Sequence, residues 1–300
     1  MDFGELASRI RETGPRTLVV VAADEEAVLD GVARAAADGI ANPVLYGHAA
    51  AIASLADELH VDTSRWEIVD VEDPVEAAVA AMARIREGRA DAVMKGRIPT
   101  PDFMRACLKN GLKRQGRLLS HLALFDHPRI GRLIALTDSG VVPFPTLEQR
   151  VAIVQNAVRA MRALGVDEPK IAGLSSSEVP DDKIPPSIEM ARLKEMNAEG
   201  GALDGWGVID GPLDLFSAID PRAADTKGLG GAVVGRADIL HCPDVVSGNL
   251  MGKSIVFFAD DVRTGGCVIG GAVPVVLLSR ASSADDKYCS IVAALSCAAA

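Results

Sequence analysis

A serine and an arginine end an apolar run close to the C-terminus. Residues 273–279, "VPVVLLS", have the β-branched composition of a buried strand, and Ser279 and Arg280 stand at its exit. An arginine that leaves a core strand must reach a partner, and α/β proteins bind ligands beyond the carboxyl ends of their parallel strands. The pair therefore predicts a binding site for an anion.

A carboxylate follows this pair after a short spacer. Ser283 and Asp286 have the spacing of a helix capping box, with aspartate in place of the usual glutamate or glutamine. From these residues alone, helix capping is the favoured interpretation of Asp286.

A second basic group lies in residues 95–112, "KGRIPTPDFMRACLKNGL". The pattern predicts a strand that ends at Lys95, then a helix that opens at Pro101 and carries Arg105. Lys95, Arg97 and Arg105 are therefore candidates to converge on an anion at a helix N-terminus. A solvated basic face explains the same charges equally well.

Several familiar motifs fail on their spacing. "SGNLMGKS", residues 247–254, ends like a phosphate loop, but the first required glycine falls at Ser247. "GLGGAVVG" carries Val233 at the third glycine position of a dinucleotide fingerprint. The five histidines show no metal-ligand spacing, and no G-x-S-x-G elbow is present. We expect no nucleotide-hydrolysing loop, no dinucleotide fingerprint and no metal.

Composition limits the classes of partner. The chain has 300 residues, of which 49% are hydrophobic and 24% charged, which is typical of a well-cored globular protein. A net charge of −10 argues against nucleic acid or an anionic membrane as partner. Five cysteines without a C-x-x-C pair predict reduced, buried thiols. No uncharged stretch reaches the length of a spanning helix, so we expect a cytoplasmic protein.

Short apolar runs alternate with helical patterns along the chain. This alternation predicts βαβ units and mainly parallel sheets. A short turn joins residues 118–125 to residues 132–138, so that pair is predicted antiparallel and the sheet mixed. The best candidate boundary lies in residues 143–150, "PFPTLEQR". The predicted strands are residues 17–23, 42–47, 66–70, 91–96, 118–125, 132–138, 170–176, 206–211, 237–244, 266–271 and 273–279.

Several segments, in order, resemble one enzyme family. "MKGRIPTPDFMRACL" is similar to a K-G-x-x-x-T-x-D-x-L-R-A pattern, with Lys95, Thr100 and Arg105 in place. "GRLLSHLALF", "LTDSGVVPFPTLEQRVAIVQNA", "DGPLDLFSA", "GRADIL", "GNLMGKS" and "SRASSADDK" follow. The sequence resembles the phosphate acetyltransferase/phosphate butyryltransferase family over nearly its whole length.

The resemblance implies an architecture. It implies two three-layer α/β domains with mainly parallel, mixed sheets, similar to the isocitrate and isopropylmalate dehydrogenases. The first domain is expected to comprise residues 1–143 plus 265–300, and the second residues 144–264, with the active site in the cleft between them. The family's members are typically homodimers, so a homodimer is expected.

The resemblance also implies a reaction, in which acyl-CoA and phosphate are reversibly converted to acyl phosphate and CoA by direct attack. Ser279 and Arg280 fall on the family's active-site pair, and Asp286 on the carboxylate that acts as base toward the CoA thiol. The substrate-binding residues are expected to be Lys95, Thr100, Arg105 and Asn249, with Arg105 on the phosphate. Acyl-CoA and phosphate are the expected partners, and no cofactor beyond these substrates is expected.

Three questions stay open from the sequence. "LLSH" and "DGPL" resemble the butyryl branch whereas Asp286 resembles the acetyl branch, so the acyl-chain length is undecided. An NAD- and metal-dependent decarboxylating dehydrogenase is an alternative with the same architecture. A non-catalytic relative that binds CoA or acyl phosphate is the other.

Overall fold

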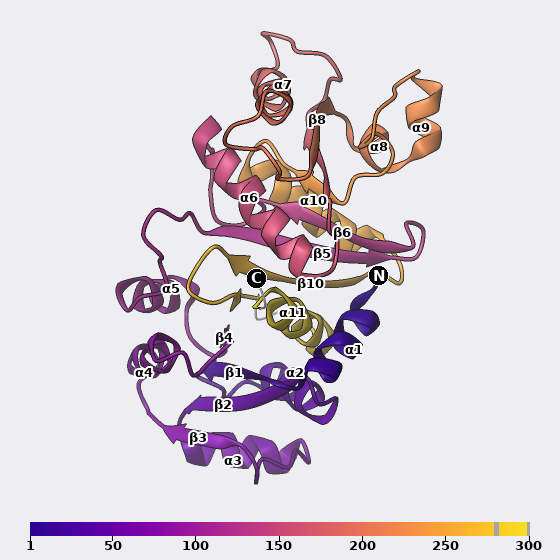
Figure 1. Cartoon of the computed structure of the whole chain (residues 1–300). Coiled ribbons are helices and arrows are strands. Elements are labelled where there is room, and N and C mark those ends of the chain that lie inside the picture. Colours follow the sequence, from indigo (N-terminus) through magenta and orange to yellow (C-terminus); the bar gives the residue numbers. More distant parts are fainter. Residues whose placement is uncertain (279–281, 299–300) are drawn as a thin grey trace. The chain divides into compact units, whose positions relative to one another are not determined.

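The computed structural model describes residues 1–278 and 282–298, which form two compact units (Figure 1). One unit comprises Met1–Arg117 together with the segment that begins at Arg263, and we call it the first unit. The second unit is Leu118–Val262. The division differs from the expected boundary at 143/144, because the hairpin of residues 120–137 pairs with a strand of the second unit.

The first unit is built on a sheet in the order β3-β2-β1-β4-β11-β10. All its neighbouring strands are parallel except β10 and β11. The strands are β1 (Arg16–Val21), β2 (Ala41–Gly47), β3 (Glu67–Asp70), β4 (Ala92–Lys95), β10 (Arg263–Ile269) and β11 (Val275–Val276). The helices are α1 (Phe3–Thr13), α2 (Glu26–Ala37), α3 (Ala49–Glu58), α4 (Pro74–Arg86), α5 (Thr100–Lys109) and α11 (Ala284–Cys297).

The strand order of the first unit contains a reversal. The chain runs outward through β1, β2 and β3, and then β4 returns to the other side of β1. Right-handed crossovers therefore place helices on both faces of the sheet. The reversal makes the carboxyl ends of β1 and β4 a topological switch point, which is where open α/β sheets bind ligands.

The alanine-rich tail of the chain is a core helix. In α11, every residue from Lys287 to Cys297 is buried, as is expected of a helix packed on all sides. The helix packs against α1, α2 and β10. Gly31 of α2 allows this approach, because a Cβ there would lie 3.0 Å from the Cβ of Lys287.

The second unit has a mixed sheet in the order β5-β6-β9-β7-β8. The β5–β6 hairpin is antiparallel and the other neighbours are parallel, which confirms the prediction of a mixed sheet. Its strands are β5 (Ser120–His127), β6 (Arg132–Thr137), β7 (Lys170–Leu174), β8 (Val208–Leu213) and β9 (Ile239–His241). Its helices are α6 (Leu147–Ala163), α7 (Pro185–Ala198), α8 (Leu215–Ile219), α9 (Pro221–Thr226) and α10 (Val245–Phe258).

The segment that imitates a phosphate loop is helical. Asp244 caps α10 by accepting a hydrogen bond from the Ser247 backbone N–H, so residues 247–254 lie within that helix. Gly248 lets the helix approach the end of β6, since a Cβ there would lie 2.7 Å from the Asp138 carbonyl oxygen. The glycine serves helix packing, in agreement with the rejection of a nucleotide-binding loop.

Two further expectations concern cysteines and membranes. All five cysteines are free and buried, as predicted. Within the described ranges, none of the helices combines the length and apolar character needed to cross a membrane.

Candidate functional site

The switch point of the first unit is closed by a tight backbone contact. A Cβ on Gly96 would lie 2.1 Å from the Ala22 carbonyl oxygen, so only glycine fits there. The backbone N–H groups of Gly96 and Arg97 donate to the carbonyl oxygens of Val21 and Ala22, at 2.8 and 2.7 Å. Ala22 itself has a φ of 52°. The segments that follow β1 and β4 are therefore held together at the sheet edge.

Lys95 and Arg97 have different roles at this edge. Lys95 is buried, and its Nζ donates to the carbonyl oxygens of Gly96 and Ile98, both at 3.0 Å. Its charge thus supports the turn that leads into α5. Arg97 is exposed and pairs with Asp24, which follows β1, at 3.3 Å. Among the described residues, Lys95 contacts the turn before α5, Arg97 contacts Asp24 and Arg105 contacts Asp102. Their convergence on one anion stays a prediction.

Thr100 and Arg105 belong to α5. Thr100 is the first residue of the helix and is exposed. Arg105 is 61% exposed, and its guanidinium pairs with Asp102 at 2.8 Å. An exposed pair of this kind is weak, so an incoming phosphate can compete for the guanidinium.

Asp286 closes the capping box of α11, as the sequence predicted. Its Oδ2 accepts hydrogen bonds from the Ser283 backbone N–H at 2.9 Å and from the Ser283 hydroxyl at 2.8 Å. Its Oδ1 accepts a hydrogen bond from the Thr264 hydroxyl at 3.0 Å. One oxygen therefore serves the cap, and the other is oriented by a neighbouring strand.

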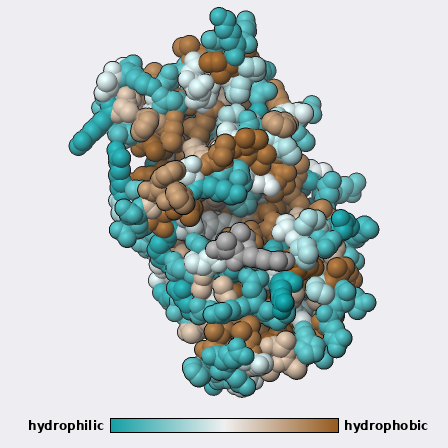
Figure 2. Space-filling model, turned by 180° about the vertical axis from the view of Figure 1, so that it is seen from behind, coloured by the Kyte–Doolittle hydropathy of each residue, from teal (hydrophilic) through white to brown (hydrophobic). Residues whose placement is uncertain are grey.

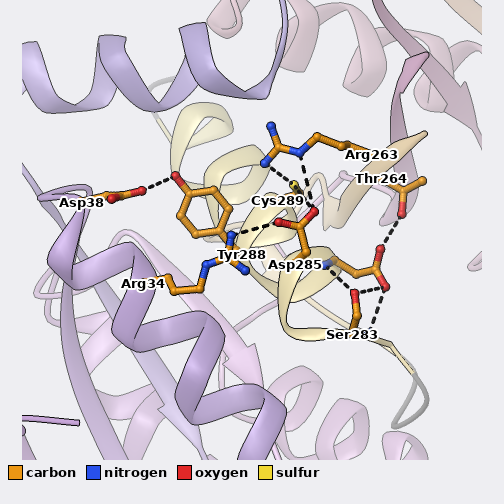
Figure 3. A network of polar contacts seen from close by, with 9 residues as sticks. Arg34, Asp38, Arg263, Thr264, Ser283, Asp285, Tyr288 and Cys289 are labelled. Carbon is orange, nitrogen blue, oxygen red and sulfur yellow. Dashed lines mark hydrogen bonds and ion pairs between the residues drawn. The ribbon is translucent and has the colours of Figure 1, made fainter. Parts of the chain in front are cut away.

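Asp285 is bound in a separate set of contacts. Its carboxylate pairs with Arg34 at 2.9 Å and with Arg263 at 3.6 Å (Figure 3). The Arg34 guanidinium also lies over the ring of Tyr288, 4.8 Å from its centroid. Burial, and then the hydrogen bond to Asp38, raise the pKa of Tyr288. Asp285 thus joins α11 to α2, whereas Asp286 faces the first residues of its own helix and Thr264.

Sequence reasoning missed Lys287. Its side chain is 2% exposed, and its Nζ lies 3.1 Å from Oε1 of Glu25 and 3.0 Å from the Ser282 carbonyl oxygen. Glu25 precedes α2, so this pair brings the start of α11 to the segment that follows β1. A lysine followed by the small and apolar residues "YCSIVAALSC" was the available signal.

Ser279 and Arg280 lie outside the described residues, so their catalytic role stays a prediction. The described residues on either side of this pair show at which edge of the sheet the segment lies. β11 is parallel to β4 and ends at Val276, and α11 begins at Ala284. Within the described part of the first unit, Lys95, Glu25 and Lys287 therefore lie at the same edge of the sheet.

Asn249 belongs to the second unit and is described with it. It is exposed, and its side-chain amide donates to the Ser139 carbonyl oxygen at 3.2 Å. The Ser139 hydroxyl lies 2.8 Å from Nδ1 of His121, so His121 is hydrogen-bonded, as a structural histidine should be. The Asp138 carboxylate accepts three backbone N–H bonds, from Gly140, Val141 and Val142. Asn249 thus contacts a rigid turn at the carboxyl end of β6.

A buried histidine lies nearby on β9. His241 is fully buried, and neither ring nitrogen has a hydrogen-bond partner among the described residues. Burial, and then the charge of buried Arg150, lower the pKa of His241 to about 3. Arg150 itself pairs with Glu189 at 2.5 Å. His241 is therefore neutral in the folded protein at any physiological pH.

This burial predicts that the protein loses stability in weak acid. In the unfolded chain His241 regains a pKa near 6.5, so the unfolded state binds more protons than the folded state between about pH 6.5 and pH 3. The contribution of neutral His241 to the free energy of unfolding is present above pH 6.5 and is lost as the pH falls. From pH 7 to pH 5 the loss amounts to about 2 kcal/mol. Urea unfolding at pH 7 and pH 5 should show that His241→Gln reduces the difference in the free energy of unfolding between the two pH values. An unchanged difference would contradict the lowered pKa of His241.

Comparison of the sequence with known proteins shows which family the chain is similar to. A family described as "Phosphate acetyl/butaryl transferase" matches residues 72–295. The chain is 37% identical to phosphate butyryltransferase of Clostridium beijerinckii, over 98% of this chain and 96% of that protein. It is 38% identical to phosphate acetyltransferase of Rhizobium meliloti, over 97% of this chain and 92% of that protein.

The chain belongs to the phosphate acetyl/butyryl transferase family. It is therefore an acyltransferase, as the resemblance implied. The relatives from the butyryl and acetyl branches are almost equally similar, so they leave the acyl-chain length open.

The structural comparisons agree with the family and correct the expected fold. A branched-chain phosphotransacylase from Enterococcus faecalis matches with a TM-score of 0.82 and 27% identity, over 94% of this chain and 99% of that one. A phosphotransacetylase from Streptococcus pyogenes matches with a TM-score of 0.83 and 23% identity, over 100% of this chain and 99% of that one. The α/β class holds, but the expected likeness to the isocitrate and isopropylmalate dehydrogenases was wrong. That expectation came from the family resemblance alone. The apolar runs could not test it, because they carry no information about strand order, which distinguishes one α/β fold from another.

Proposed function

We propose that this family member transfers a short acyl group, acetyl or butyryl, reversibly between CoA and inorganic phosphate by direct attack. The observation that carries the proposal is the setting of Asp286. Its Oδ2 holds the cap, while Oδ1 has Thr264 as its hydrogen-bond donor and one lone pair left for a substrate proton. This carboxylate lies at the carboxyl edge of the sheet, a few residues after Ser279 and Arg280.

The chemistry follows from these groups in the direction of acyl phosphate plus CoA. Asp286 takes the proton of the CoA thiol, whose free pKa is near ~8.5. The thiolate sulfur attacks the acyl carbonyl carbon, and Arg280 and Ser279 stabilise the oxyanion that forms. The C–O bond to phosphate then breaks, the C–S bond remains, and phosphate leaves with the electron pair. Arg105 binds that phosphate through a charge-assisted contact.

The decisive experiment is phosphate-dependent release of CoA. Purified protein is incubated with acetyl-, propionyl-, butyryl- and isobutyryl-CoA, with and without phosphate or arsenate, and free thiol is measured. Release only in the presence of phosphate or arsenate, without added metal or nicotinamide, is expected. A requirement for NAD and a divalent metal, or CoA binding without release, would contradict the proposal. The ratio of kcat/KM values along the series gives the acyl-chain preference.

Arg105 supplies a separate prediction. Arg105→Ala should raise the KM for phosphate by roughly tenfold to over a hundredfold, because a charge-assisted hydrogen bond contributes ~1.5–3 kcal/mol. The KM for acyl-CoA should change much less. Arg192→Ala is a matched control, since Arg192 is also an exposed helix arginine paired with an acid three residues away. An unchanged KM for phosphate would leave Arg105 as a solvated surface residue.

A homodimer in the cytoplasm is proposed as well. The support is a row of exposed apolar side chains along one face of α10, namely Val246, Leu250 and Phe257. In the upper part of the view in Figure 2, apolar residues (brown) lie next to one another rather than being scattered singly. Large exposed patches of this kind mark interfaces. Light scattering should give twice the mass of the chain, and Leu250→Glu should reduce it.

A further inference from the structure

The second unit contains a hollow that the acyl-transfer chemistry does not use. It has a volume of about 1170 Å³. Arg132 and Lys170, the first residues of β6 and β7, line it, and so does Asp238, which precedes β9. It therefore opens at the amino ends of these parallel strands. The turn that Asn249 contacts lies at the carboxyl end of β6, so the two places are at opposite ends of the same strand.

The floor of the hollow is apolar. Phe125, Ile134 and Leu240 are core residues of this unit that also line the hollow. Met251 and Ile255, on one face of α10, are partly buried against the same core. A ligand with an aliphatic body would gain hydrophobic burial on this floor.

The rim of the hollow carries excess positive charge. Two of its arginines are paired, Arg132 with Asp238 at 3.0 Å and Arg129 with Asp220 at 3.9 Å. Three further cations, Lys170, Arg222 and Arg236, line the hollow and form no ion pair within the described ranges. The Asp238 carboxylate is already engaged, because it also accepts the Lys170 backbone N–H at 2.9 Å. On a chain with a net charge of −10, this is a local site for an anion.

We propose that this hollow binds an aliphatic carboxylate, with the chain on the floor and the carboxylate at the cationic rim. The lining argues for this class over a nucleotide. Besides arginine, lysine and aspartate, Ser254 and His127 supply the polar side chains of the described lining, whereas a base and a ribose need several placed hydrogen-bonding groups. The volume of about 1170 Å³ exceeds the ~300–1000 Å³ that is typical of small-molecule sites, so an aliphatic chain of medium length has room.

Calorimetry on the full chain tests the proposal with octanoate, hexanoate and 1-octanol as probes, each below its micelle concentration. Octanoate should bind with one site per chain. Its affinity should exceed that of hexanoate by roughly fifteenfold, since each buried methylene contributes about fourfold. 1-Octanol, which has the same chain without the charge, should bind at least tenfold more weakly than octanoate.

Variants separate the site from unspecific binding. The double variant Lys170→Ser/Arg236→Ser should weaken octanoate at least tenfold. The control Arg192→Ser/Lys253→Ser removes two positive charges from the same unit outside the hollow and should leave the affinity unchanged. Ile255→Asp, on the floor, should abolish binding while circular dichroism and melting temperature verify folding.

Four results would overturn the proposal. They are equal affinities for octanoate and 1-octanol, equal affinities in the two double variants, tighter binding of ADP than of octanoate, and an octanoate affinity that falls as protein concentration rises. The last result would mean that a second copy of the chain covers the hollow. None of these measurements depends on release of CoA, so failure here leaves the proposed acyl transfer untouched.

Discussion

Asp286→Asn is expected to lower the rate of acyl transfer to CoA by ~10²–10⁴-fold at neutral pH, with little change in melting temperature. Asparagine can still accept the capping hydrogen bond from the Ser283 N–H, so the helix start survives. It has no carboxylate to take the thiol proton. The measurement is kcat for acyl phosphate plus CoA across pH 6 to 10.

The pH profile separates the base from a structural role. As the pH rises through the thiol pKa of about 8.5, CoA ionises without help, so the deficit of Asp286→Asn should shrink. A misplaced helix would give a deficit that is the same at every pH. Full activity of Asp286→Asn at pH 7 would contradict the assignment of Asp286 as base.

Two neighbouring variants serve as controls. Ser283→Ala removes the capping oxygen and should cost about 1 kcal/mol of stability while keeping the rate, because the carboxylate stays in place. Thr264→Val removes the hydroxyl that orients Oδ1 and should lower kcat by less than Asp286→Asn. A rate loss in Ser283→Ala as large as in Asp286→Asn would mean that only the cap matters.

Lys287→Met should lower the free energy of unfolding by about 3–5 kcal/mol. The methionine keeps most of the buried volume, but the Glu25 carboxylate loses its ammonium partner inside the first unit. Breaking a buried ion pair on one side is costly because the remaining charge is left without compensation. Urea unfolding at pH 7 measures the change.

A second substitution distinguishes the lost charge from lost packing. In Lys287→Met/Glu25→Leu no charge is left unpaired, so much of the stability should return. Arg192→Met removes one partner of an exposed pair on α7 and should have little effect. If Lys287→Met alone changes stability by under 1 kcal/mol, the pair does not hold α11 to the start of α2.

The sequence by itself determined the local structure of this protein. Each of the eleven predicted strand runs overlaps a strand, because short apolar runs between turn residues, alternating with longer helical patterns, favour strands. The capping box of Ser283 and Asp286 was readable because its two residues are three positions apart. The order of the motifs also indicated the family, which the comparisons confirmed.

Only the tertiary structure decided which distant residues meet. Glu25 reaches Lys287, Thr264 reaches Asp286 and Gly96 touches Ala22 through strand order and helix packing. Periodicity reports which face of an element is buried but not what covers that face. For that reason the sequence offered Asp286 as a helix cap or, by resemblance, a base, and only the structure shows that one oxygen holds the cap while the other contacts Thr264.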